Sequence, residues 1–256
     1  MDFMISANTD IGTSRSSNED GVLINVIDTV HGRMVLAVLC DGMGGLSCGD
    51  VASTFMIRAF ENWSQEELPD LCRVTLTDSV VRTSWERLIE TCSREIQMYG
   101  NRNNMRLGTT IVAILITQVR YYVMNVGDSR AYELTEDGIR QLTEDQTVVN
   151  NQVRMGILSR EEAQRDPNRH VLSQCVGASK EVYPEMFFGV ARKDAVYLLC
   201  SDGFYNQMLP CEIQESLRPS ELCNDYIMTQ RSLELIEQDK RRGEHDNITV
   251  ALVRTY

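Results

Sequence analysis

The feature that most constrains this chain is a series of short β-rich runs, many of them separated by short turns. Strands that follow one another across a short turn pair antiparallel, whereas parallel neighbours need a long crossover. The turn Glu136-Asp137-Gly138 is typical of a hairpin, since glycine tolerates positive φ. The runs with strand composition are residues 21–28, 34–40, 109–117, 121–126, 131–134, 195–200 and 248–254.

Longer segments between these runs favour helices. Residues 50–63, 77–99 and 219–242 have helical length and patterning, and two of them separate groups of strands. Trp63 and Trp85 fall within the first two segments, so we expect both side chains in the core. The sequence therefore predicts an α+β fold in which long helices cover an antiparallel sheet core.

A polar segment at residues 144–170 differs from the rest of the chain. Within it, Ser159 precedes Arg160, Glu161 and Glu162 in the manner of a helix N-cap. We expect a small helical insertion between strands, of the kind that often lies beside a functional site and shapes access to it. No repeat, low-complexity tract or Pro/Ser-rich linker divides the 256 residues, so one domain is predicted.

Composition excludes several classes of function. A formal net charge of -12 argues against nucleic-acid binding, and the one basic run, residues 240–242, is interpreted as a solvated helix end. No apolar stretch could span a membrane and the N-terminus lacks a signal-peptide pattern, so we expect a cytoplasmic protein. The eight cysteines form no C-x-x-C pair. Cys40 and Cys200 end apolar runs and are predicted to be small buried side chains.

Acidic residues stand at the tips of several predicted strands. In an antiparallel sheet the end of one strand lies beside the start of the next, so these residues could gather at one edge. A single Asp-Gly is usually a turn, but its recurrence at strand ends is harder to explain that way. Gathered carboxylates repel one another unless cations neutralise them, and hard ions such as Mg²⁺ and Mn²⁺ choose oxygen ligands. The acidic residues are Glu19, Asp20, Asp41, Asp128, Asp202 and Asp246, and Asn18, Gly42, Gly203 and Asn247 adjoin them.

These motifs resemble, in their order and along nearly the whole chain, the metal-dependent protein phosphatase family. This is the family of type 2C serine/threonine phosphatases, and the similarity is greatest to its compact bacterial members. The resemblance implies an αββα sandwich of two antiparallel sheets, a single phosphatase domain over residues 1–256, and a helical flap at residues 147–170. The matching segments are residues 15–20 (RSSNED), 41–45 (DGMGG), 107–110 (LGTT), 126–130 (VGDSR), 142–145 (LTED), 171–177 (VLSQCVG), 199–203 (LCSDG) and 246–250 (DNITV).

The resemblance also implies a site for two core ions, Mn²⁺ or Mg²⁺, with a third held more weakly. Asp41 would bridge the core ions and Gly42 would offer its carbonyl oxygen, while a water between the ions would attack phosphorus directly. Arg15 would grip the substrate phosphate through its planar fork. An ion pair with Glu19 or Asp20 is the simpler role for Arg15 and could coexist with the first. The remaining implied metal ligands are Glu19 and Asp20, partly through water, Asp202 and Asp246 on one core ion, and Asp128 on the third ion.

The activity implied is hydrolysis of phosphoserine and phosphothreonine in other proteins. The partners would be phosphorylated substrates of a serine/threonine kinase, and a monomer is expected. Two residues depart from the family pattern: Met43 replaces a histidine proposed as general acid in mainly eukaryotic members, and Gln146 replaces a frequent histidine. The proton for the leaving group must then come from metal-bound water or from elsewhere. His245, beside Asp246, is one candidate, although a lone loop histidine is more simply an exposed side chain.

Other phosphatase chemistries lack their motifs in this sequence. No cysteine is followed by arginine six positions later, the three histidines have no helical pair spacing, and no P-loop is present. Two alternatives on the same fold stay open. One is a catalytically silent binding module, which is a minority reading because Asp41, Asp202 and Asp246 are all present. The other is a phosphatase for a small phosphoester, since metal-activated water is not selective by itself.

Overall fold

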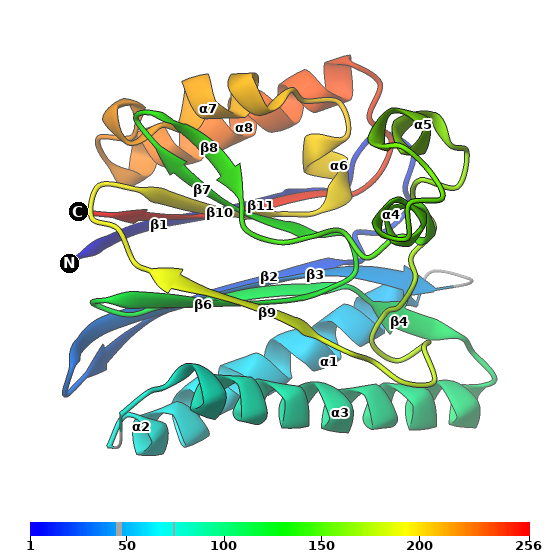
Figure 1. The fold of residues 1–256 in the computed structure, drawn as a ribbon, viewed down its shortest axis with the longest axis horizontal. Helices are drawn as coiled ribbons and strands as arrows, with labels where there is room; N and C mark the ends of the chain where they lie inside the picture. The colour runs from blue at the N-terminus through cyan, green and yellow to red at the C-terminus, as the bar shows by residue number, and fades with distance from the viewer. Residues whose placement is uncertain (45–47, 74) are drawn as a thin grey trace.

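The computed structural model has two antiparallel sheets stacked face to face, with helices on both outer surfaces (Figure 1). It describes residues 1–44, 48–73 and 75–256. Gly45, the last residue of one matching segment, lies outside these described residues. The arrangement confirms the predicted α+β class and the αββα sandwich.

The first sheet brings together strands from both ends of the chain. Its order is β1-β11-β10-β7-β8, and each strand pairs antiparallel with its neighbours. N-terminal β1 pairs with C-terminal β11 from Phe3↔Thr255 to Asp10↔Ile248, which closes the fold. The bounds are β1 Phe3–Asp10, β7 Arg130–Thr135, β8 Gly138–Gln141, β10 Val196–Cys200 and β11 Ile248–Thr255.

The second sheet has the order β2-β3-β5-β6-β9, and the short β4 pairs with the end of β3. Its central strands are apolar on both faces because the first sheet covers one face and helices cover the other. The bounds are β2 Asp20–Thr29, β3 Gly32–Gly44, β4 Leu107–Thr109, β5 Ile111–Ile116, β6 Arg120–Val126 and β9 Glu185–Val190.

Helices cover the two outer faces of the sandwich. In Figure 1, α1 and α3 lie beneath the second sheet, and α7 and α8 lie above the first. A π-helical segment, Trp63–Glu67, follows α1, and a 3-10 turn, Pro219–Glu221, precedes α8. The bounds are α1 Gly49–Asn62, α2 Leu68–Leu71, α3 Asp78–Asn103, α4 Val148–Arg154, α5 Arg160–Arg165, α6 Asp202–Tyr205, α7 Pro210–Leu217 and α8 Asp225–Arg241.

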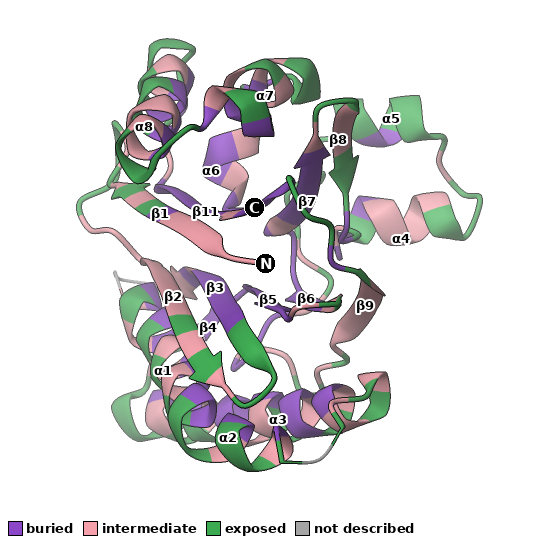
Figure 2. Cartoon of the chain, turned by 90° about the vertical axis from the view of Figure 1, so that its left-hand side faces the viewer, coloured by how far each residue is buried: buried purple, intermediate pink, exposed green. Residues whose placement is uncertain are grey.

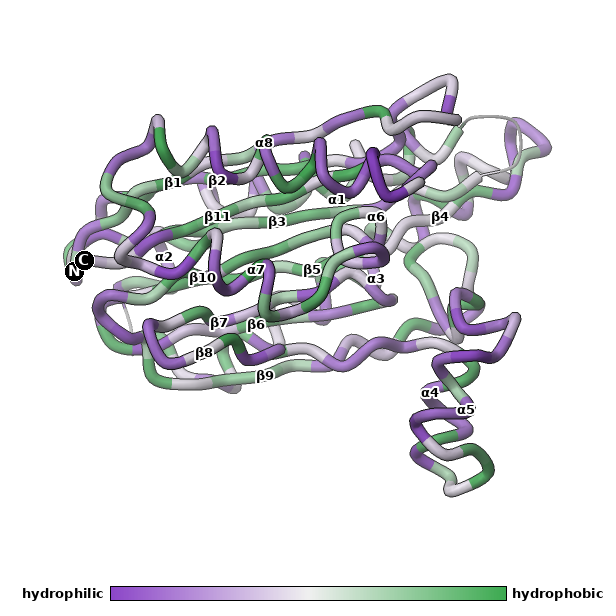
Figure 3. The backbone as a smooth tube through the Cα atoms, turned by 90° about the horizontal axis from the view of Figure 1, so that it is seen from above, coloured by the Kyte–Doolittle hydropathy of each residue, from purple (hydrophilic) through white to green (hydrophobic). Residues whose placement is uncertain are grey.

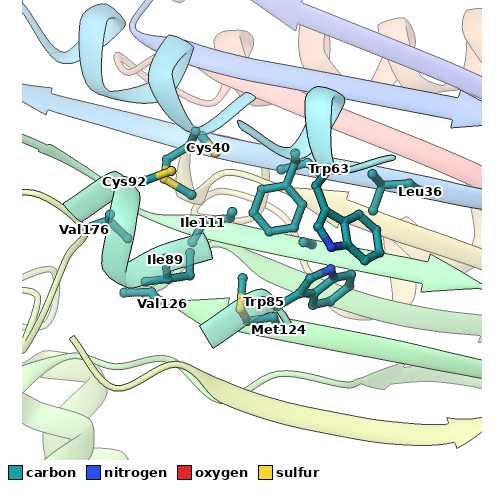
Figure 4. Close-up of a cluster of buried hydrophobic side chains, with 14 of the residues drawn as sticks. Leu36, Cys40, Trp63, Trp85, Ile89, Cys92, Ile111, Met124, Val126 and Val176 are labelled. Atoms are coloured by element: carbon teal, nitrogen blue, oxygen red, sulfur yellow. The ribbon is translucent and has the colours of Figure 1, made fainter. Parts of the chain in front are cut away.

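The core consists of three apolar layers. One lies between the two sheets, and the other two lie between each sheet and the helices that cover it. Figure 2 shows the inner strands as buried, with exposed residues on the outward helix surfaces. Trp63 and Trp85 form the aromatic centre of the layer between the second sheet and helices α1 and α3. Their ring centroids lie 5.6 Å apart (Figure 4). The indole N–H of Trp63 donates to Ser84 Oγ at 2.7 Å, so its one polar atom is satisfied. Both tryptophans are core residues, as predicted.

The structure confirms most predicted elements and adds edge strands. The expected hairpin turn at 136–138 joins β7 to β8, and the expected N-cap Ser159 forms a capping box with Glu162 at the start of α5. The third predicted helix begins later than expected, at Asp225. Strands β1 and β9 and the short helices α2, α6 and α7 were not predicted. Cys40 and Cys200 are fully buried, as expected.

The basic run at 240–242 ends α8, as interpreted from the sequence. Lys240 bonds to Asp10 and Glu237, and Arg242 pairs with Glu212, so two of these cations are already neutralised. No helix among the described residues has the combination of length and apolarity needed to cross a bilayer.

Candidate active site

The strand tips that carry acidic residues meet at one end of the sandwich. β2 and β3 are in a register that sets Asp20 directly opposite Asp41. Asp202 follows β10 and Asp246 lies just before β11, which pairs with β10, so their antiparallel pairing brings both to the same end. A cavity of about 320 Å³ opens there. Its lining includes Arg15, Glu19, Asp41, Gly42, Met43, Thr110, Asp128, His170, Asp202, Asp246 and Asn247.

Asp41 is fixed by the strand turn that faces it. Its N–H donates to Thr110 Oγ1 at 3.0 Å, and its carbonyl oxygen accepts from Thr110 N–H and from Thr109 Oγ1, both at 2.9 Å. Thr110 Oγ1 also lies 2.7 Å from the hydroxyl of Ser129. The backbone of Asp41 is therefore held on both sides, which leaves its carboxylate free to face the cavity.

The loop before β2 is tied to the C-terminal strand by one amide side chain. Asn247 Oδ1 accepts from Glu19 N–H at 2.9 Å, and Asn247 Nδ2 donates to the carbonyl oxygens of Ile11 and Ser17. The carbonyl oxygen of Glu19 accepts from Gly42 N–H at 3.2 Å. These bonds join segments from opposite ends of the sequence and place Glu19 and Gly42 at the cavity wall.

Asp128 is positioned through an arginine and a tyrosine. Tyr205 Oη donates to the carbonyl oxygen of Asp128 at 3.0 Å. The guanidinium of Arg130 stacks on the Tyr205 ring, 3.5 Å from its centroid, and forms a bidentate pair with Asp145. Asp128 is buried at the border of the cavity, within reach of its other carboxylates.

Arg15 contacts Asp246, which differs from the pairing considered in the sequence analysis. Its Nη2 lies 2.6 Å from Asp246 Oδ2, whereas no ion pair joins it to Glu19 or Asp20 in the described part of the chain. About half of the Arg15 side chain is exposed, so its guanidinium can still reach a ligand in the cavity.

The cluster is electrostatically costly without cations. Burial raises the pKa of Asp20 to about 7 and that of Asp128 to about 8. Burial, followed by the charge of Asp20, raises the pKa of Asp41 well above its ordinary value. The pKa of Asp202 is also raised, first by burial and then by Asp246. Asp20 and Asp128 therefore hold protons for part of the time at neutral pH unless positive charge is supplied.

The donor set fits hard divalent cations. Both carboxylate oxygens of Asp20 and Oδ1 of Asp202 are buried without a hydrogen-bond partner. The hydroxyls of Thr249 and Ser201 lie near Asp20 and lower its pKa, but burial outweighs them and the pKa of Asp20 stays raised. Unpartnered carboxylate oxygens are the ligands that Mg²⁺ and Mn²⁺ prefer.

Not all of these carboxylates point at one another. Among the described residues, no three acidic, histidine or cysteine side chains are arranged to hold one ion as they stand. Asp246 is turned toward Arg15. For these side chains to share an ion, at least some of them must rotate from their present positions.

A second, larger cavity of about 490 Å³ adjoins the first. Its walls come from the first sheet and from α4 and α5, which project from the body of the sandwich (Figure 3). Asp128 and His170 line both cavities, so the two are neighbours. Arg160 and Arg169 line the larger cavity, and within the described ranges neither side chain has a hydrogen-bond or ion-pair partner.

Comparison with known proteins identifies the family. The family model for protein phosphatase 2C matches residues 13–251. The serine/threonine phosphatase stp of Listeria innocua is 33% identical over 251 residues, covering 96% of this chain and 93% of that protein. This chain belongs to the protein phosphatase 2C family. The finding confirms the family resemblance and the activity class predicted from the sequence, a metal-dependent protein serine/threonine phosphatase.

Solved structures agree with this family membership. The S. agalactiae serine/threonine phosphatase superposes with a TM-score of 0.84 at 30% identity, covering 99% of this chain and all of that one. The catalytic domain of the phosphatase PstP, solved in complex with two manganese ions, has a TM-score of 0.78 at 28% identity. It covers 98% of this chain and 97% of that domain. The predicted Mn²⁺ or Mg²⁺ cofactors are thus confirmed for the family.

Sequence reasoning missed three residues of the site. Thr110 was interpreted only as the start of a buried strand, yet its hydroxyl accepts from Asp41. Asn247 falls in the matching segment 246–250, and an amide beside a strand tip is the sequence signal for the bonds that it makes to the loop before β2. His170 lies in a polar segment far from every aspartate in the sequence, so only the folded chain brings it to the cavity.

Proposed function

We propose that this phosphatase hydrolyses phosphoserine and phosphothreonine in other proteins at the cavity lined by Asp41, Asp202 and Asp246. The observation that carries the proposal is the convergence of acidic residues from five segments of the chain on one cavity, with buried carboxylate oxygens left unpartnered. Cations stabilise such a cluster, because they neutralise carboxylates that otherwise repel one another or hold protons. Family membership supports the same conclusion.

In this proposal the residues of the cavity share the work of metal binding. Divalent ions supply a nucleophile at neutral pH, because they lower the pKa of bound water. Asp41 and the carbonyl oxygen of Gly42 would hold one core ion, and Asp41, Asp202 and Asp246 the other. Glu19 and Asp20 would support them, partly through water. Asp128, buried at the border toward the second cavity, would help to hold a third ion.

Arg15 is proposed to bind the substrate phosphate. Its guanidinium is half-exposed and lines the cavity, and its present partner is Asp246. A phosphate in the cavity would offer two oxygens to the planar fork, a better match than one carboxylate oxygen. Arg15 would then release Asp246 toward a metal ion, so substrate and cations would reinforce each other.

Residues 147–170 are proposed to act as a flap within a single domain spanning residues 1–256. The flap carries α4 and α5 and forms one side of the cavity of about 490 Å³. A groove of this size beside the carboxylates suits the peptide around a phosphorylated residue. We further propose that the substrates are products of a serine/threonine kinase, and that the protein acts as a cytoplasmic monomer.

The proposal is tested by turnover of a phosphothreonine peptide in Mn²⁺. Wild-type protein should release phosphate, EDTA should abolish the release, and Asp41→Asn and Asp202→Asn should each lower kcat by about 100-fold or more, as expected for loss of metal-assisted catalysis. Asp137→Asn, in the β7–β8 turn away from the cavity, is the matched control and should be unaffected. Activity that persists in EDTA or survives both site substitutions defeats the proposal.

The same assay separates the two alternatives on this fold. A silent binding module would show no turnover and no Mn²⁺ binding by calorimetry. An enzyme for small phosphoesters would hydrolyse a small phosphoester much faster than the phosphopeptide when the two compete in one reaction.

A further inference from the structure

Hydrolysis of a phosphoserine or phosphothreonine leaves an alkoxide that must acquire a proton. An aliphatic alkoxide is a poor leaving group, so an acid placed beside the departing oxygen accelerates the reaction, typically by 10²–10⁴-fold. Met43 lines the cavity together with Asp41 and Gly42, but a thioether has no proton to give. This part of the inference rests on the function proposed above.

One histidine lines the cavity that holds the carboxylates. His170 forms part of the wall of both cavities, which places it where the carboxylate cluster meets the groove beneath the flap. This junction is where the bond between phosphate and substrate side chain would lie, with the phosphate on the carboxylate side and the peptide in the groove. His170 is exposed and, in the described residues, its imidazole has no hydrogen-bond partner. His170 is also close enough to Asp202 for its charge to lower the pKa of that carboxyl. An exposed imidazole without a hydrogen-bond partner can donate to a ligand and recover its proton from solvent.

The other two histidines are elsewhere and are occupied. His31 Nε2 lies 2.8 Å from the carbonyl oxygen of Cys72, in the helical layer beneath the second sheet. His245 Nδ1 lies 2.8 Å from the hydroxyl of Thr13, and His245 does not line the cavity. The structure therefore does not favour His245, the candidate considered from sequence, although it stands beside Asp246.

The backbone around His170 is held in place. Asp166 and Asn168 form turns, with Arg169 N–H donating to the carbonyl oxygen of Asp166 and Val171 N–H to that of Asn168. Immediately after His170, Val148 N–H donates to the carbonyl oxygen of Val171 at 2.8 Å. His170 thus extends from a pinned turn at the base of the flap, so its position does not depend on the flap tip.

We propose that His170 is the general acid of this phosphatase. In the step, the bond from phosphorus to the substrate oxygen breaks as a bond from phosphorus to the water oxygen forms. The substrate oxygen takes the proton from protonated His170 and leaves as a serine or threonine hydroxyl, while His170 becomes neutral. The proton of the attacking water passes to solvent, and solvent reprotonates His170 after inorganic phosphate departs.

The test compares two leaving groups in the full-length protein with saturating Mn²⁺. His170→Gln keeps a polar side chain of similar reach but cannot act as an acid. On a phosphothreonine peptide we expect its kcat to fall about 100-fold, the ordinary size of general acid catalysis. On para-nitrophenyl phosphate we expect kcat to stay within about twofold of wild type, because nitrophenolate leaves without a proton. That second activity also reports that the variant is folded and binds metal.

His31→Gln is the matched control, since it removes a histidine far from the cavity, and it should behave as wild type on both substrates. The inference is overturned if His170→Gln loses the same factor on both substrates, if only its KM for the peptide changes, or if His245→Gln shows the leaving-group-dependent loss instead. Failure of wild-type protein to hydrolyse the peptide would count against the proposed function. Normal peptide turnover by His170→Gln would count against this inference alone.

Discussion

At the residue scale, the site depends on how closely two backbone segments approach beside Gly42. A Cβ atom on Gly42 would lie 2.3 Å from the carbonyl oxygen of Gly49 and 2.5 Å from that of Glu19. Both obstacles are backbone atoms, which cannot rotate away. The glycine that follows Asp41 is therefore required by packing as well as by any metal contact of its carbonyl group.

Replacing Gly42 by alanine should accordingly destabilise the protein and weaken the site. We expect the free energy of unfolding to fall by about 1–3 kcal/mol, the usual cost of forcing an extra methyl group into a packed region. Affinity for Mn²⁺ should fall with it, because Glu19 and Asp41 flank the clash. The measurements are urea unfolding and Mn²⁺ calorimetry. Gly138→Ala is the control, since a Cβ there meets nothing within 4 Å. Equal stability of the two variants would contradict the packing argument.

At the scale of elements, the flap presents positive charge to the groove. Arg154 on α4 is neutralised by Glu144 and Glu185. Arg160 on α5 and Arg169 after it have no such partners in the structurally described portion. In a chain of net charge -12, unpaired cations in a groove favour a substrate with acidic residues near its phosphorylated side chain.

Arg160→Ala should raise the KM for a phosphothreonine peptide that carries acidic neighbours. We expect an increase of about two- to fivefold, the value of one exposed ion pair. Turnover of para-nitrophenyl phosphate, which does not reach the groove, should not change. Arg165→Ala is the matched control, because Arg165 lies on the same helix but does not line the cavity. An equal effect of both substitutions, or an equal effect on both substrates, would show that Arg160 in the groove does not recognise acidic residues of the peptide.

The elements also show what sequence could and could not reveal. Central strands such as β3 and β5 are continuous apolar runs because both faces are covered, and such runs are visible in sequence. Strands β1 and β9 lie at sheet edges and are mostly half-buried. β1 therefore mixes apolar with polar residues, and its sequence pattern is a weak indication of a strand. The short α6 is a single turn after β10 and has too few residues for a periodic pattern.

For the site, sequence located the acids but not their supports. Asp41, Asp202 and Asp246 stand next to strand runs, so antiparallel pairing alone places them at the ends of neighbouring strands. The hydrogen bonds from Asp41 to Thr110 and from Glu19 to Asn247 depend on three-dimensional packing. The same is true of His170, which reaches the cavity only through the path of the flap.

At the scale of the whole molecule, a buried acidic residue outside the cavity also lowers the stability of the fold when it is charged. Asp239 on α8 is fully buried and both of its carboxylate oxygens lack a hydrogen-bond partner. Burial, followed by the charge of Glu244, raises the pKa of Asp239 to about 8 from 3.8. Between these values the folded protein holds a proton that the unfolded chain releases, so stability falls as pH rises through this window.

Asp239→Asn should remove this pH dependence. In EDTA, the free energy of unfolding of wild type should fall relative to that of the variant by on the order of 1 kcal/mol for each pH unit between about pH 5 and pH 8. Comparing the two proteins at each pH cancels the contribution of the acids in the cavity, which both share. Urea unfolding at several pH values provides the measurement. A difference between the proteins that does not vary with pH would mean that Asp239 is charged in the folded state.

The central claim is that acidic side chains from distant parts of the chain jointly hold divalent ions. The most direct measurement is an anomalous difference map from crystals of the wild-type protein grown with Mn²⁺. The account predicts at least two manganese peaks in the cavity of about 320 Å³, with Asp41 touching both and Asp202 and Asp246 touching one. A cavity without manganese, or peaks held by residues other than these aspartates, would contradict it.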